Sequence, residues 1–269
     1  GVMAIITFVV SVLLLITVHN EGINVYAIGN WSAPFGIVLV ADMLSSLLVT
    51  LTSFLGVMVV LYGCAGDDEH GSFFHPLIHF LILGVNGAFL TGDLFNVFVF
   101  FEVLLIASYA LLMHGGGKQK TKAALHYVIL NLVGSSAFLI GLGILYGVLG
   151  TLNIADMAQK ISLLTGDDVY LAKAGGLLLL VVFALKSALL PLHLWLPNTY
   201  SSAAPVVAAL FAIMTKVGVY AMLRVYTVMF GEQAGELEHM AQTWLWGLAI
   251  ATIVVGAIGV LAAQDLRKI

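Results

Sequence analysis

Three ionisable side chains, Glu102, Lys186 and Lys216, lie near the middle of long apolar runs. Each run is long enough to cross a bilayer, in a chain that is 61% hydrophobic and only 9% charged. A Lys or Asp at the centre of a membrane helix costs about 2.5 to 3.5 kcal/mol in insertion scales, so such a residue points to a function. Groups of this kind on three different runs are suited to taking up and releasing protons inside a membrane.

Glu102 is surrounded in sequence by Phe98, Phe101 and Leu105. Its ionised form is disfavoured there unless a cation or a chain of water molecules reaches it. A lysine on another run is the partner that we expect. The alternative is a protonated glutamic acid that only hydrogen-bonds a neighbouring helix.

Lys186 is followed five residues later by Pro191. Proline has no N–H and clashes with the carbonyl of the residue four positions earlier, so the helix is expected to break just past the lysine. Broken helices at membrane depth occur where they are buried in protein or line a wet cavity, and they recur at ion sites of transporters. The alternative, a lysine that snorkels to the interface, fits poorly because Lys186 is about fifteen residues into its run.

Lys216 has Thr215 beside it and Tyr220 one turn further on, so a proton could pass along these side chains and water. Loss of hydration makes it easier for a lysine to give up its proton. The alternative is a static ion pair. His193 lies past the Pro191 break, where it is either a proton relay or a histidine whose polar atoms are satisfied by neighbours.

Two aspartates near the ends of apolar runs, Asp42 and Asp93, are further candidates, although capping of a helix or hydration at the interface explains them more simply. His75 and His79 are four residues apart, which suits a metal pair, but no other ligands accompany them in sequence. The chain has one cysteine, which excludes a disulfide framework and a thiolate cluster. We therefore expect no metal and no cofactor.

The elements that must position these residues are apolar helices. Apolar runs bounded by polar residues, Gly or Pro predict an all-α membrane protein that forms one transmembrane domain over residues 1–269. The eight expected spans are residues 2–18, 37–62, 74–91, 94–113, 123–149, 171–196, 204–229 and 242–262. The polar residues 151–168 predict an aqueous connection with a short surface helix.

Basic residues between the spans predict the orientation of the chain. One side collects five of them and the other side three: Lys118, Lys120, Lys122, Arg267 and Lys268 against Lys160, Lys173 and Arg224. This bias places the loop 114–122 and both ends of the sequence in the cytoplasm. Because the first and last residues adjoin apolar runs, we expect the chain to be part of a longer polypeptide.

Several of these segments together resemble a known family. They are Gly-Asp-Leu-Phe-Asn-Val-Phe-Val-Phe-Phe-Glu ending at Glu102, the Lys186 segment with His-Leu-Trp-Leu-Pro at 193–197, Ala-Ala-Pro-Val-Val-Ala-Ala-Leu at 203–210, and Thr-Lys-Val-Gly-Val-Tyr at 215–220. The chain resembles the antiporter-like subunits shared by Mrp-type sodium/proton antiporters and respiratory complex I. Within that family the first segment is most similar to the D subunits of Mrp antiporters. Asn198 departs from complex I relatives, which often carry Asp there.

The resemblance implies a fourteen-span subunit with two inverted repeats, each containing a broken helix. The eight spans here would be the second to the ninth, so the first span and almost all of the second repeat would be missing. By motif, Glu102, Lys186 and Lys216 match the family's charged residues of the fifth, seventh and eighth spans. Other membrane subunits, protons, and sodium or another monovalent cation are the implied partners, in the cell membrane.

The function that these observations predict is proton translocation in a multisubunit monovalent cation/proton antiporter, a transporter and not an enzyme. In this hypothesis Glu102 and Lys186 form a switchable ion pair, and Lys216 exchanges protons with Lys186 when the pair opens. The nearest alternative is the pump module of a redox-driven complex, such as a complex I-like dehydrogenase or a membrane-bound hydrogenase. A cytochrome using His75, His79, His126 or His193 and a purely structural scaffold are less suited to three central charges, and nothing in the sequence suggests nucleic-acid binding.

Overall fold

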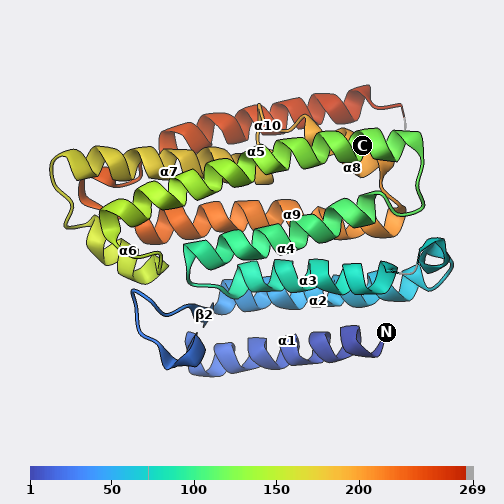
Figure 1. Ribbon diagram of the computed structural model, residues 1–269, viewed down its shortest axis with the longest axis horizontal. Helices are drawn as coiled ribbons and strands as arrows, with labels where there is room; N and C mark the ends of the chain where they lie inside the picture. The colour runs from blue at the N-terminus through green and yellow to red at the C-terminus, as the bar shows by residue number, and fades with distance from the viewer. Residues whose placement is uncertain (72, 265–269) are drawn as a thin grey trace.

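The computed structural model describes residues 1–71 and 73–264. It is a bundle of long, roughly parallel helices with one short β-hairpin, and α1 and α10 lie at opposite edges (Figure 1). The helices are α1 (Val2–Glu21), α2 (Met43–Gly63), α3 (Phe74–Leu90), α4 (Leu94–Leu112), α5 (Lys118–Leu149), α6 (Ile154–Ile161), α7 (Asp167–Lys186), α8 (Trp195–Ser202), α9 (Pro205–Arg224) and α10 (Gln242–Ala262). The strands are β1 (Asn24–Ala27) and β2 (Val38–Ala41).

Among the described residues, seven helices are long and apolar enough to cross a membrane. The apolar helix α3 is slightly shorter, with 17 residues. The chain is therefore a multi-pass membrane protein, which confirms the predicted all-α fold with about eight spans. The short helix α6 lies in the predicted polar connection and ion-pairs Lys160 with Asp156 across one turn at 3.1 Å.

The apolar stretch expected to be helical from residue 37 instead begins as a strand. Residues 38–41 pair antiparallel with residues 24–27, with Val38 opposite Ala27. Helix α2 starts only after Asp42, which accepts a hydrogen bond from the Ser45 N–H at 2.8 Å while the Ser45 hydroxyl accepts from the Asp42 N–H at 2.9 Å. This reciprocal capping fixes the helix start. A short apolar run does not reveal by periodicity whether it is a strand or a buried helix.

The predicted span 171–196 is two elements. Helix α7 ends at Lys186, part-way along the bundle, and α8 begins at Trp195 nearer the other end (Figure 1). The structure thus confirms the break that Pro191 predicts. The predicted span 204–229 likewise changes geometry near its end, because residues 225–229 form a π-helix after α9.

Two of the basic residues on which the predicted orientation rests, Arg267 and Lys268, lie outside the described residues. Helix α5 begins at Lys118, so the basic residues Lys118, Lys120 and Lys122 belong to its first turns. With 32 residues, α5 is about 48 Å long at 1.5 Å per residue, longer than the apolar core of a bilayer. Its basic end can therefore stand outside the apolar region.

The break in α7 is packed directly against α9 at Gly218. A Cβ atom built on Gly218 would lie 2.7 Å from the Ser187 nitrogen and 3.0 Å from the Lys186 carbonyl carbon. Both are backbone atoms at a helix end, so they cannot turn aside as a flexible side chain could. The absence of a side chain at Gly218 is what lets α9 approach the end of α7.

We expect Gly218→Ala to destabilise the purified full-length protein by about 1 to 3 kcal/mol, the usual cost of overpacking a tight contact. The measurement is the thermal unfolding midpoint in detergent. Gly143→Ala is the matched control, because a Cβ there would meet nothing within 4 Å. Equal midpoints for the two variants would contradict a tight contact between α7 and α9.

Candidate functional site

The buried amine of Lys186 is linked to Glu102 through a serine on a third helix. Lys186, at the end of α7, is only 5% exposed and its Nζ donates to the Ser135 hydroxyl at 3.4 Å. The Ser135 hydroxyl in turn donates to Oε1 of Glu102 on α4. Asn131, one turn before Ser135 on α5, accepts a further hydrogen bond from Nζ at 3.2 Å. Residues from α4, α5 and α7 thus form one continuous hydrogen-bonded cluster.

This arrangement modifies the predicted contact between Glu102 and Lys186. The structure brings the two residues into one site, but among the described residues no direct ion pair joins them, and Ser135 stands between them. The two side chains are therefore connected through a hydroxyl group. A hydroxyl can accept a hydrogen bond from one partner while it donates to the other.

Aromatic and small side chains shape the space around the amine. The ring of Phe101 lies 5.8 Å from Nζ, a distance that allows a cation–π contact. Phe101, Phe138 and Phe183 are essentially unexposed and their rings contact one another. A Cβ on Gly134 would come within 2.6 Å of the Leu185 side chain. The small residue therefore lets α5 lie close to the lysine, inside an apolar wall.

The broken end of α7 leaves backbone carbonyls without helical partners, and nearby donors satisfy them. The Trp195 indole donates to the Leu185 carbonyl at 3.0 Å, and the Leu189 N–H donates to the Ala184 carbonyl at 2.8 Å. On the far side of the break, the Leu190 N–H donates to the Thr252 hydroxyl of α10 at 3.0 Å. These bonds make an interrupted helix tolerable in an apolar surrounding, and the carbonyl end of α7 favours a cation there.

Sequence reasoning missed the two α5 residues. Neither Ser135 nor Asn131 is among the candidate residues selected from the sequence. Both are buried, at 6% and 1% exposure, although they lie in a span. The available signal was their spacing, because residues four apart share one face of a helix and two polar groups on one face of an apolar helix mark a polar contact.

Lys216, predicted to exchange protons with Lys186, lies outside the hydrogen-bonded cluster of Lys186. Its side chain is on the exposed face of α9 together with Ala212, Val219 and Leu223. Among the described residues, the one hydrogen bond of Nζ is a long one, 3.4 Å, to the neighbouring Thr215 hydroxyl. No hydrogen bond or ion pair joins Lys216 to Lys186 among the described residues, so direct exchange between them is not what this geometry provides.

His193 lines a cavity of about 570 Å³ between the helix break and α10, which also contains Tyr200 and Thr252. Its Nδ1 is buried and has no hydrogen-bond partner among the described residues. The Tyr200 hydroxyl donates to the Phe211 carbonyl of α9. The cavity wall therefore combines one unpartnered ring nitrogen with mostly apolar side chains.

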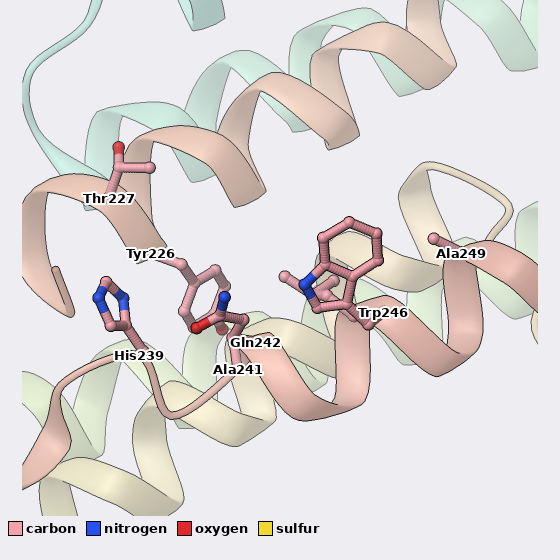
Figure 2. A pocket seen from close by; sticks show the side chains of 8 residues that line it. Tyr226, Thr227, His239, Ala241, Gln242, Trp246 and Ala249 are labelled. Carbon is pink, nitrogen blue, oxygen red and sulfur yellow. The ribbon is translucent and has the colours of Figure 1, made fainter.

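A second cavity, of about 320 Å³, lies between the π-helix 225–229 and the start of α10 (Figure 2). Labelled side chains around it include Tyr226, His239 and Trp246. The Tyr226 hydroxyl is engaged, donating to the Gly176 carbonyl at 2.6 Å. None of the predicted site residues lines this cavity.

Tyr220 and Asp42 form a separate polar network near the β-hairpin. Arg224 on α9 ion-pairs with Asp42, and its Nε donates to the Tyr220 hydroxyl at 2.8 Å. That hydroxyl donates to the Phe89 carbonyl at 2.6 Å. Tyr220 therefore joins α9 to α3, and its hydroxyl is committed to these partners and not to Lys216. From the sequence, Arg224 entered only the prediction of orientation, as one of the basic residues between the spans.

Asp42 and Asp93 both cap helices, which is the simpler of their two predicted roles. Asp93 accepts a hydrogen bond from the Asn96 N–H at 2.9 Å at the start of α4. Burial raises the pKa of the Asp93 carboxyl, against the opposing hydrogen bonds from the N–H groups of Asn96 and Phe95. Burial acts in the same direction on Asp42, but there the hydrogen bond and charge of Arg224, with the Ser45 N–H, hold the pKa below its ordinary value of 3.8.

The sequence and the fold of this chain are similar to those of known proteins. The family model described as "NADH:quinone oxidoreductase/Mrp antiporter, TM" matches residues 91–269. The D subunit of a probable K⁺/H⁺ antiporter from Rhizobium meliloti is 45% identical over 98% of this chain and 50% of its own length. The D subunit of the Na⁺/H⁺ antiporter from Bacillus subtilis is 45% identical over 98% of this chain and 53% of its own length.

Among solved structures, the Mrp complex from Dietzia sp. DQ12-45-1b superposes with a TM-score of 0.86 at 32% identity. The match covers 99% of this chain and 49% of that chain. The chain thus spans about half the length of the curated relatives it matches.

The ion pair of Asp42 and Arg224 gives a pH-dependent prediction. Because the folded-state pKa of Asp42 is depressed, its stabilising contribution is complete above the unfolded value of 3.8 and is lost as the pH falls through the lower folded value. We expect Arg224→Gln to lower the unfolding midpoint at pH 7 and to lose most of this deficit below pH 3.8.

A double-mutant cycle with Asp42→Asn isolates the pair, and at neutral pH its coupling should be about 0.5 to 1 kcal/mol because both side chains remain partly exposed. A deficit of Arg224→Gln that is the same at every pH would rule out Asp42 as the titrating partner.

Proposed function

Because the chain belongs to the NADH:quinone oxidoreductase/Mrp antiporter family of transmembrane proteins, we propose that it moves protons across the cell membrane within a multisubunit monovalent cation/proton antiporter. The observation that carries the proposal is the chain of two hydrogen bonds that runs from Lys186 through Ser135 to Glu102. It places a base, a hydroxyl and an acid in contact inside an apolar bundle. A structural scaffold has no need of such an arrangement.

In the proposed proton transfer between Lys186 and Glu102, Ser135 is left chemically unchanged. The hydroxyl proton of Ser135 passes to Glu102 while Ser135 accepts a proton from the Lys186 ammonium. The result is a neutral amine, a neutral carboxylic acid and an unchanged serine. The reverse step restores the charges, so the cluster can alternate between a charged and a neutral state without a change in net charge.

The apolar wall makes this alternation responsive to its surroundings. Two opposite charges attract more strongly in a low-dielectric site than in water, but each also loses hydration there. A charge that arrives nearby, or water that enters at the helix break, therefore changes which state is favoured. The membrane potential acts on any net charge moved, at about 2.3 kcal/mol per charge per 100 mV.

We propose that Lys216 takes part in a later proton-transfer step, and that a protein segment outside this part of the protein completes its surroundings. A lysine in mid-span that faced lipid would be costly, so its exposed position on α9 calls for a covering protein segment or a wet cavity. Thr215 connects it to the α9 backbone. We propose that His193, with its unpartnered Nδ1, links the cavity near α10 to the break after Lys186.

The names of the relatives support a monovalent cation as the exchanged ion, potassium for one and sodium for the other. We propose sodium or another monovalent cation, with other membrane subunits as partners. We also propose that the loop between α4 and α5 faces the cytoplasm, since α5 begins with three lysines. Copurification of peripheral iron–sulfur proteins would instead favour the pump module of a redox-driven complex.

The test of this function uses the full-length protein in its complex, in everted membrane vesicles. Glu102→Gln and Lys186→Ala should each abolish cation-dependent proton flux, because each removes one end of the proton-transfer sequence. Copurification of the other subunits serves as the control for assembly. Normal flux in either assembled variant would sink the proposal.

Ser135→Ala tests the bridging hydroxyl separately. We expect flux to fall at least about a hundredfold, the lower end of what a positioned proton-transfer group contributes, while Ser135→Thr retains most activity. Ser136→Ala is the matched control, because the Ser136 hydroxyl is exposed and, within the described part of the chain, donates to the Leu132 carbonyl of its own helix and to no other group. If Ser135→Ala transports as fast as Ser136→Ala, the proton does not pass through Ser135.

A further inference from the structure

Three side chains with different donor atoms meet where α2 ends and α3 begins. Cys64 directly follows α2, Asp68 lies in the 3-10 turn Asp67–His70, and His75 is in the first turn of α3. The cysteine sulfur, a carboxylate oxygen of Asp68 and a ring nitrogen of His75 all lie within 4.8 Å of one another. We propose that these three residues bind a divalent transition-metal ion of the zinc type.

The distances suit such an ion. Oδ2 of Asp68 and Nε2 of His75 are 3.2 Å apart. In a tetrahedral zinc site with metal–nitrogen and metal–oxygen bonds of 2.0 to 2.2 Å, two such ligand atoms are about 3.4 Å apart. A sulfur ligand would stand about 3.6 Å from the oxygen by the same geometry. Because all three ligand atoms lie within 4.8 Å of one another, a shift of the thiol on the order of 1 Å is enough to complete three corners of a tetrahedron, with the fourth left for water.

An ion pair between Asp68 and His75 alone does not explain why the Cys64 thiol lies beside them. Cys64 is exposed, and the side chains of Asp68 and His75 are 28% and 37% exposed, so an ion in solution can reach all three. On binding, the ion replaces the thiol proton, which is released to water, and a metal–sulfur bond forms. The step needs no oxidant or reductant.

The loop that bears Asp68 is held in place by the neighbouring α4–α5 connection. Nε2 of His114 donates to the Asp67 carbonyl at 2.9 Å, and Lys120 Nζ donates to the His114 carbonyl at 2.8 Å. The ring of His114 also lies 4.9 Å from that of Phe74 at the start of α3. This support reduces the ordering that an ion would have to impose on the loop.

The mixture of ligands selects the class of metal. A thiolate and an imidazole favour zinc and similar transition metals, whereas magnesium and calcium take oxygen ligands. The site is therefore unlike one for sodium or potassium and is separate from the transported cation. Bound metal would tie the end of α2 to the start of α3. The sequence predicted no metal because no further ligands adjoin His75 and His79; the tertiary structure brings Cys64 and Asp68 to His75 from across a loop.

The experiment measures protection of Cys64 in the full-length protein within its complex, after chelator treatment. Maleimide modification of Cys64 is followed by mass spectrometry of its peptide, with and without micromolar Zn²⁺. We expect Zn²⁺ to slow modification at least tenfold in the unaltered protein. Asp68→Asn and His75→Gln should each weaken the Zn²⁺ dependence at least about tenfold, since even loss of a group that only supports a ligand costs 10- to 100-fold in affinity.

Matched controls are Asp67→Asn, the neighbouring carboxylate, and His19→Gln, an exposed histidine on α1. Both should retain protection. Isothermal titration with Zn²⁺ gives a second readout that includes Cys64→Ser, which should lose binding. If protection is unchanged in Asp68→Asn and His75→Gln, the thiol alone binds Zn²⁺. If micromolar Zn²⁺ gives no protection in the unaltered protein, Asp68 and His75 form only an ion pair. Either result overturns the proposal. Both readouts are independent of proton flux, so this test and that of the transport function can fail separately.

Discussion

The hydrogen bonds of the Lys186 amine are the interaction around which the bundle is organised. An amine buried this deeply is stable only if its hydrogens have acceptors, because an unpaired charge in an apolar interior is very costly. Asn131 and Ser135 supply two of those acceptors from α5. The contact requires α5 and α7 to lie close together, and Gly134 permits this approach. The hydrogen bonds of one amine thus join α5 to α7 at a point where the two helices lie close together.

The helix break adds a second requirement, which α8, α9 and α10 meet together. The carbonyls freed at the end of α7 need donors, and Trp195 provides one from α8. Gly218 lets the α9 backbone cover the broken end, while Thr252 of α10 accepts from the far side of the break. An interruption that would be unstable alone is therefore fixed by three neighbouring elements. It keeps Lys186 at the end of α7, where the helix is interrupted.

The two ends of the bundle are joined by different chemistry. Near the β-hairpin, Asp42 both caps α2 and pairs with Arg224, so a helix start and a helix end are held by one carboxylate. At the opposite end, Cys64, Asp68 and His75 converge on a loop between two helices. Neither cluster contributes to the Lys186 site directly. The first joins α2 to α9, which packs against α7, and the second lies between α2 and α3, which packs against α4, so each is linked to the site through one intervening helix.

The sequence by itself determined the membrane fold, the approximate spans, the three central charges and the position of the break, because run length and proline act locally along the chain. Only the tertiary structure decided that Ser135 separates Glu102 from Lys186 and that Lys216 faces outward. In spans that are apolar on every side, hydrophobic periodicity does not define which face of a helix meets which neighbour. The rotation of each helix about its axis, and the meeting of distant loop residues, follow from packing between helices and are therefore absent from the pattern of any one of them.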